Sequence, residues 1–124
     1  MNKTILVVED DQFLSKILKL KLEKNGYTVV LGVDGADALE KIKAQPVNAV
    51  ILDLMMPGRD GFAFLQDLKK VPSLKNIPII VSSNLGQKDD KQKAMELGAT
   101  DYIVKSDTSL DELLHRVSLV LEKW

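Results

Sequence analysis

An uninterrupted apolar run, Ile5-Leu6-Val7-Val8, leads directly into Glu9-Asp10-Asp11 and indicates the class of fold. Its four apolar residues do not alternate with polar ones, and this is typical of a strand that is buried on both faces of a parallel sheet. Further runs rich in β-branched residues predict four more short strands. These runs are Tyr27–Leu31, Ala49–Leu52, Ile77–Val81 and Tyr102–Val104.

Segments with helical spacing lie between and after the predicted strands. The first of them is expected to gather five apolar residues on one face, with lysines on the opposite face. The five are Phe13, Leu14, Ile17, Leu18 and Leu20. Because strands and helices alternate five times, the sequence predicts an α/β fold: a single doubly wound domain over residues 1–124, with a five-stranded parallel sheet and five helices on its two faces.

Two glycines support the predicted helix ends. Gly26 and Gly98 each stand where a helix must stop and the chain must turn back into a strand. That turn uses the left-handed backbone region, which glycine adopts without strain at Cβ.

The fourth predicted helix, near residues 87–97, differs from the others. Its apolar residues are limited to Ala94, Met95 and Leu97 among many charged ones. With so few core contacts it should be weakly held, as is typical of the elements that move in a fold.

Composition excludes several classes of site and partner. Lys plus Arg number 17 and Asp plus Glu 18, a formal charge of −1, so no basic excess favours a direct nucleic-acid partner. The chain has no Cys and one His, His115, which excludes thiolate nucleophiles and multi-histidine metal sites. The N-terminal apolar run is too short for a signal peptide or a membrane span, so we expect a cytoplasmic protein without a membrane partner.

The residues that follow the predicted strands carry the candidate chemistry, because ligands of open α/β sheets bind beyond the carboxyl ends of the strands. These residues are Glu9-Asp10-Asp11, Asp53, Ser82-Ser83-Asn84 and Lys105-Ser106. Carboxylates gathered at one sheet edge repel each other unless a cation lies among them or one is protonated. Oxygen ligands without His or Cys favour a hard cation, Mg²⁺ before Zn²⁺.

The first loop also argues against nucleotide and flavin sites. Such sites place a glycine-rich or hydroxyl-rich turn at a helix N-terminus to receive phosphate. The acidic Glu9-Asp10-Asp11 would reject a phosphate unless a metal bridged the two.

Three strings in this order resemble the receiver domains of bacterial response regulators, and the resemblance covers essentially the whole chain. The strings are Leu6–Asp11, then Asp53–Gly58 followed by Asp60-Gly61, and then Gly98-Ala99 leading to Asp101–Lys105. The resemblance implies a flavodoxin-like sheet with strand order 2-1-3-4-5.

The resemblance also implies a role for each matching residue. Asp53 would be the phosphoacceptor, and its carboxylate would attack the phosphorus of a donor to give an acyl phosphate. Mg²⁺ would be bound by Asp10 directly, by Glu9 mainly through water, by Asp53 and by the backbone carbonyl of Met55. Lys105 would contact a phosphoryl oxygen and offset its developing charge.

A switch is implied by two further residues. Ser83, preferred to Ser82 from its place in the string, would donate a hydrogen bond to the phosphoryl group, and strand alternation directs the two serines to opposite sides. Tyr102 would turn inward as the hydroxyl of Ser83 moves. The surface of the fourth helix, fifth strand and fifth helix would then change for a downstream protein partner.

One departure from the family pattern lies directly after Lys105. Receiver domains usually have proline, after a cis peptide, where this chain has Ser106. A cis bond before a residue other than proline costs about 3 kcal/mol, so this loop is either trans or strained.

The resulting hypothesis is a signalling switch rather than an enzyme. It would take a phosphoryl group from a histidine kinase or phosphotransfer protein with Mg²⁺, act on a protein effector without direct nucleic-acid contact, and allow a phosphorylation-dependent dimer. Two alternatives stay open. One is a receiver-like scaffold that is never phosphorylated. The other is a hydrolase with Asp53 as nucleophile, although such enzymes need an acid two residues on, where this chain has Met55.

Overall fold

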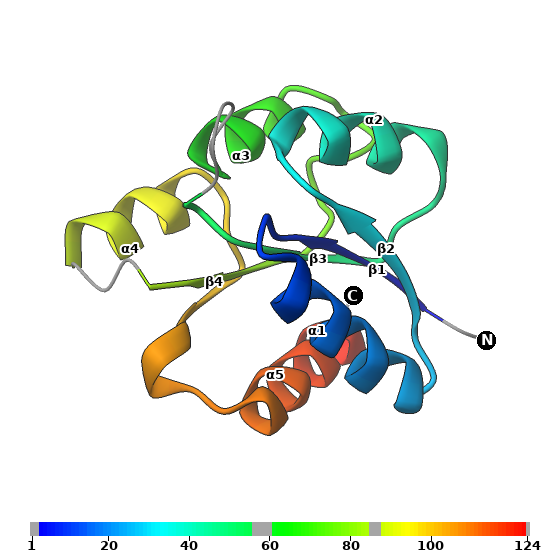
Figure 1. The fold of residues 1–124 in the computed structure, drawn as a ribbon. Coiled ribbons are helices and arrows are strands. Elements are labelled where there is room, and N and C mark those ends of the chain that lie inside the picture. The colour runs from blue at the N-terminus through cyan, green and yellow to red at the C-terminus, as the bar shows by residue number, and fades with distance from the viewer. Residues whose placement is uncertain (1–2, 56–60, 85–87, 124) are drawn as a thin grey trace.

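A five-stranded parallel sheet with helices on both faces makes up the part of the chain that the computed structural model describes, residues 3–55, 61–84 and 88–123 (Figure 1). Its strands are β1 (Thr4–Val8), β2 (Thr28–Gly32), β3 (Ala49–Leu52), β4 (Ile79–Ser83) and β5 (Asp101–Val104). Its helices are α1 (Gln12–Lys24), α2 (Gly35–Ala44), α3 (Gly61–Lys69), α4 (Lys88–Glu96), the short 3₁₀ turn η1 (Lys105–Asp107) and α5 (Leu110–Lys123). The sheet order is β2-β1-β3-β4-β5, which confirms the predicted fold class and strand order.

Successive side chains of each central strand enter two different cores. In β1, Leu6 and Val8 pack with residues of α2, α3 and α4, whereas Ile5 and Val7 pack with residues of α1 and α5. Figure 1 shows the same division, with α1 and α5 on one side of the sheet and α2 and α3 on the other. The continuous apolar strands of the sequence therefore arise because both faces of the sheet are covered.

Two strands lie further along the chain than predicted. The strand predicted over residues 77–81 corresponds to β4, which spans Ile79–Ser83. Ser82 and Ser83 are therefore the last residues of the strand and do not follow it. Their backbones pair with Ile103 and Val104 of β5, because ladder hydrogen bonds do not depend on the side chain. Likewise the strand predicted over residues 27–31 corresponds to β2, which spans Thr28–Gly32. The last residue of β2, Gly32, pairs with Val8.

The predicted apolar face of α1 is wrong for two of its five residues. The buried residues of α1 are Ser15, Leu18 and Leu22, whereas Phe13 is 76% exposed and Leu20 is 62% exposed. Leu18 and Leu22 are four residues apart and therefore lie on one face, which packs on the sheet. Two residues along a helix is more than half a turn, so Leu20 points away from that face.

The predictions for the two helix-ending glycines are confirmed. Gly26 and Gly98 have φ values of 90° and 106°, as expected for the ends of α1 and α4. Asp11 caps α1, since its Oδ1 accepts hydrogen bonds from the backbone N–H groups of Phe13 and Leu14.

Helix α4 has the sparse attachment that its sequence predicts. Ala94 is its buried residue, and the ammonium of Lys93 lies 4.3 Å from the ring centre of Phe62 in α3, a cation–π contact. Across the described ranges, no helix combines the length and the apolar character needed to cross a membrane.

Leu18 and Leu20 offer a matched test of the orientation of α1. Replacing Leu18 by Ala should lower the free energy of unfolding by about 2–5 kcal/mol, because a buried side chain is removed. Leu20→Ala should change it by less than about 0.5 kcal/mol. Urea denaturation of the two variants measures both values, and equal losses would contradict the orientation described above.

Candidate functional site

The site lies where β1 and β3, neighbours in the sheet, reach their carboxyl ends. Hydrogen bonding continues one residue beyond each strand: the N–H of Asp53 donates to the carbonyl of Val8 (3.0 Å), and the N–H of Glu9 donates to the carbonyl of Gly32 (3.0 Å). Both carboxylate residues are thereby fixed to the sheet, and both are buried. A carboxylate is costly to bury unless it is paired or hydrogen-bonded, so the partners of these two groups decide the properties of the site.

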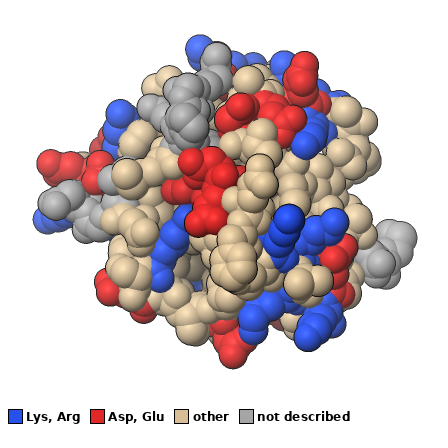
Figure 2. Space-filling model, viewed as in Figure 1, with Lys and Arg blue, Asp and Glu red and all other residues tan. Residues whose placement is uncertain are grey.

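Three carboxylates meet at this edge. One carboxylate oxygen from each of Glu9, Asp10 and Asp53 lies within 4.8 Å of the others, with Asp10 exposed. Figure 2 shows acidic side chains at the middle of this face of the molecule, with a basic side chain beside them. The structure confirms the prediction that these acidic side chains lie close together.

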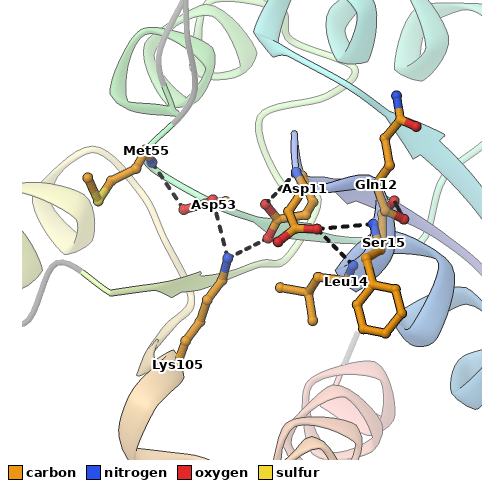
Figure 3. Close-up of polar contacts among 9 residues, drawn as sticks. Asp11, Gln12, Leu14, Ser15, Asp53, Met55 and Lys105 are labelled. Atoms are coloured by element: carbon orange, nitrogen blue, oxygen red, sulfur yellow. Dashed lines mark hydrogen bonds and ion pairs between the residues drawn. The ribbon is translucent and has the colours of Figure 1, made fainter.

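Lys105 brings the positive charge into the cluster. It starts η1 directly after β5, and its Nζ lies 3.2 Å from Oδ2 of Asp53 (Figure 3). The same Nζ is in close contact with Oε1 of Glu9. Burial by itself would lower the pKa of Lys105, but the hydrogen bond to Glu9 and the charges of Asp53 and Glu9 outweigh it and raise that pKa. The lysine therefore stays charged at neutral pH and pairs with both buried acids.

Burial strongly perturbs the acidity of Glu9. Burial raises the pKa of its carboxyl from 4.5 to about 7; the hydrogen bond to Lys105 opposes this rise, and the charge of Asp53 adds to it. Its second oxygen, Oε2, accepts a hydrogen bond of 3.2 Å from the N–H of Asp11. A cation placed among the three acids would favour the ionised form of Glu9.

Asp53 is held through both of its oxygens. Oδ1 accepts a hydrogen bond of 3.0 Å from the backbone N–H of Met55, and Oδ2 faces Lys105 (Figure 3). Gly61 packs directly behind it: a Cβ there would lie 2.7 Å from the carbonyl oxygen of Asp53 and 2.6 Å from Cα of Leu54. The need for glycine at position 61 was not inferred from the sequence, although the string Asp60-Gly61 contained the signal.

The donor set fits a divalent hard cation. With all groups ionised, Glu9, Asp10 and Asp53 contribute three negative charges and Lys105 one positive charge, which leaves −2. Carboxylate oxygens are preferred ligands of Mg²⁺. The carbonyl of Met55 was predicted as a further ligand, and the hydrogen bond from the N–H of Met55 to Asp53 keeps this residue beside the carboxylate. Residues 56–60, which belong to the family string that follows Asp53, lie outside the described ranges.

The two predicted switch residues lie on the neighbouring strands. Ser83, at the end of β4, is fully buried. Tyr102 of β5 is 7% exposed and belongs to the core shared with α2, α3 and α4, so its ring already lies inside. Burial raises the pKa of Tyr102, and the charges of Asp90 in α4 and of Asp53 raise it further.

The loop after Lys105 is in the trans form. Within the described ranges no peptide bond is cis, and Lys105–Asp107 form the turn η1. Of the two geometries considered for the bond before Ser106, the unstrained one is present. The close pairing of Lys105 with Glu9, in addition to Asp53, was not predicted.

A family model described as the response regulator receiver domain matches residues 5–118. The chain belongs to this family. Receiver domains are modules of two-component signalling whose general role is a phosphorylation switch, and they are signalling proteins rather than classical enzymes.

Solved receiver structures match this receiver domain over nearly its whole length. The Francisella response regulator 1452 receiver domain has a TM-score of 0.90 at 33% identity, and the match covers 98% of each chain. Vibrio cholerae chemotaxis protein CheY4 also has a TM-score of 0.90, at 27% identity, with 97% of this chain and 99% of that one covered.

Among curated sequences, "Probable transcriptional regulator ycf27" of Cyanophora paradoxa is 40% identical over 121 residues. That match covers 98% of this chain and 49% of the relative. The receiver domain thus spans about half the length of the curated relatives that it matches.

The acidity of Glu9 predicts an unusual pH dependence of stability. Its folded-state pKa of about 7 lies above the ordinary 4.5, so the folded state binds this proton more tightly than the unfolded state. The free energy of unfolding of the metal-free protein should therefore fall as the pH rises through that interval, by at most about 3 kcal/mol. Urea denaturation with chelator present at a series of pH values measures the effect.

Glu9→Gln should remove this fall, whereas Glu23→Gln, a change at an exposed glutamate of α1, should keep it. If Glu9→Gln and wild type showed the same dependence on pH, the assignment of the raised pKa to Glu9 would be wrong.

Proposed function

We propose that this receiver domain accepts a phosphoryl group on Asp53 and thereby switches its partner-binding surface. The observation that carries the proposal is the placement of a buried carboxylate, Asp53, 3.2 Å from a charged ammonium, Lys105, with two more acids alongside. This arrangement combines a nucleophile with the positive charge that phosphoryl transfer requires.

The transfer step would use one carboxylate oxygen of Asp53. That oxygen attacks the phosphorus of a phosphohistidine, an O–P bond forms as the P–N bond breaks, and the imidazole nitrogen leaves with the electron pair. The hydrogen bond from the N–H of Met55 to Oδ1 fixes the carboxylate plane. Lys105 would then contact an oxygen of the transferred group while keeping its charge beside the acids.

Mg²⁺ fits this proposal as the resident metal. Glu9, Asp10, Asp53 and the carbonyl of Met55 would hold it, and when bound it supplies positive charge that offsets the negative charge of the phosphoryl oxygens. The remaining positions of a small hydrated ion would be taken by water and phosphoryl oxygens.

Ser83 and Tyr102 would carry the signal away from the site. Both lie on strands that adjoin α4, which buries a single residue of its own. If the hydroxyl of Ser83 moved toward a phosphoryl group, the packing around Tyr102 would change. The surface of α4, β5 and α5 would then adopt a different conformation, which would bind a protein effector or a second receiver domain. The phosphodonor would be a histidine kinase or a phosphotransfer protein.

Phosphorylation is tested by incubating the protein with Mg²⁺ and a small acyl-phosphate donor, followed by intact-mass measurement. The wild type should gain the mass of one phosphoryl group and Asp53→Asn should gain none, because the attacking oxygen is replaced by an amide. Asp89→Asn, a change at an exposed acid of α4, is the matched control and should behave as wild type.

The two alternatives predict different outcomes in this experiment and in a parallel assay with unrelated phosphoesters. A wild type that gains no mass would favour an unphosphorylated interaction scaffold. Steady turnover of unrelated phosphoesters would favour a hydrolase, although the side chain of Met55 provides no acid two residues after Asp53.

Metal binding is tested separately by thermal unfolding with and without Mg²⁺. Added Mg²⁺ should raise the melting temperature of the wild type, because a ligand that binds only the folded state stabilises it. Asp10→Asn should reduce the shift strongly at little cost to the fold, since Asp10 is exposed, and Asp89→Asn should leave it unchanged. An equal shift in Asp10→Asn would refute the assignment of Asp10 as a ligand.

A further inference from the structure

A pocket of about 200 Å³ lies between α1 and α5, beside the phosphorylation site and on the opposite side of the sheet from α2 and α3. Figure 1 shows α1 and α5 together on this side. Its apolar walls are Leu14 and Leu18 of α1, Ile103 of β5, and Leu110 and Leu113 of α5. The pocket is separate from the carboxylate cluster, and no acidic residue lines it.

Ser82 contributes a polar group that the proposed switch does not use. It lines the pocket and is 6% exposed, because strand alternation places it on the side of Ile80 and Ile103 rather than that of Ser83. Its hydroxyl has no hydrogen-bond partner within the described ranges. No fully enclosed side-chain oxygen or nitrogen in those ranges lacks a partner, so this hydroxyl must reach the space of the pocket.

The lining determines the chemistry of a suitable ligand. A charged molecule would lose its hydration and gain only hydroxyl groups of the lining as partners, since the ammonium of Lys105 already pairs with Glu9 and Asp53. An apolar cavity of about 150 Å³ is known to hold benzene, so the volume here suits a molecule with a single ring. The hydroxyl of Ser82 can make one hydrogen bond to it.

We propose that this pocket binds a small, uncharged, single-ring molecule that carries one hydrogen-bonding group. The ring lies between the leucines of α1 and α5, and the polar group pairs with the hydroxyl of Ser82. Lys105 and Thr108 also line the pocket, so the ligand contacts the segment that carries the lysine of the phosphorylation site. The proposal does not depend on phosphorylation.

The experiment is an NMR titration of the ¹⁵N-labelled protein, without Mg²⁺ or phosphodonor, using phenol and toluene as probes. Saturable shifts are expected at the amides of Ser82, Ile103 and Thr108 with both probes. Ser82→Ala should weaken phenol binding by about three- to tenfold and leave toluene binding unchanged, because only phenol loses a hydrogen bond.

Two variants complete the design. Ser82→Val, which fills part of the pocket with a residue suited to a strand, should abolish binding of both probes. Ser118→Ala removes a hydroxyl from α5 outside this pocket and should change neither affinity.

Three results would overturn the proposal: no saturable shift, shifts centred elsewhere, or equal phenol affinities in wild type and Ser82→Ala. The last comparison holds even if Ser82→Val does not fold. Because no phosphorylation step is involved, failure here leaves the proposed function of Asp53 unaffected.

Discussion

Lys105 pairs with two buried carboxylates, and this pairing stabilises the arrangement of the whole site. Glu9 and Asp53 are fixed at the ends of adjacent strands, where each would be costly to bury alone. The ammonium of Lys105 compensates both, and Asp10 adds a third acid at the solvent side. The cluster retains a net negative charge, which favours the binding of a further cation.

The two serines that end β4 face opposite sides of the sheet. Ser83 and Tyr102 face the core shared with α4, where few contacts restrain the helix. Ser82, the neighbour of Ser83 in β4, faces the α1 and α5 side and opens into an apolar pocket. Lys105 lies between these regions because it directly follows β5. One lysine therefore links the acidic cluster to the loop that leads into α5.

Much of the site was predictable because the topology of parallel α/β sheets is restrictive. Apolar runs identified the strands, and parallel strands must bring their carboxyl ends to one edge, so Glu9, Asp53 and Lys105 were expected to meet. The strand order itself came from family resemblance. The bounds of β4 were predicted two residues too early, since the serines that end the strand have no apolar side chains to mark them.

Several features can be read along the chain without its fold: which strands are apolar throughout, where glycine permits a reversal, and which acids follow which strand. Three features required the folded structure: which face of α1 is buried, that Glu9 shares Lys105 with Asp53, and that Ser82 borders a pocket. The difference arises because strand and helix patterns depend on neighbours in the chain. Orientation about a helix axis, burial of a carboxylate and the shape of a cavity depend instead on contacts between residues far apart in sequence.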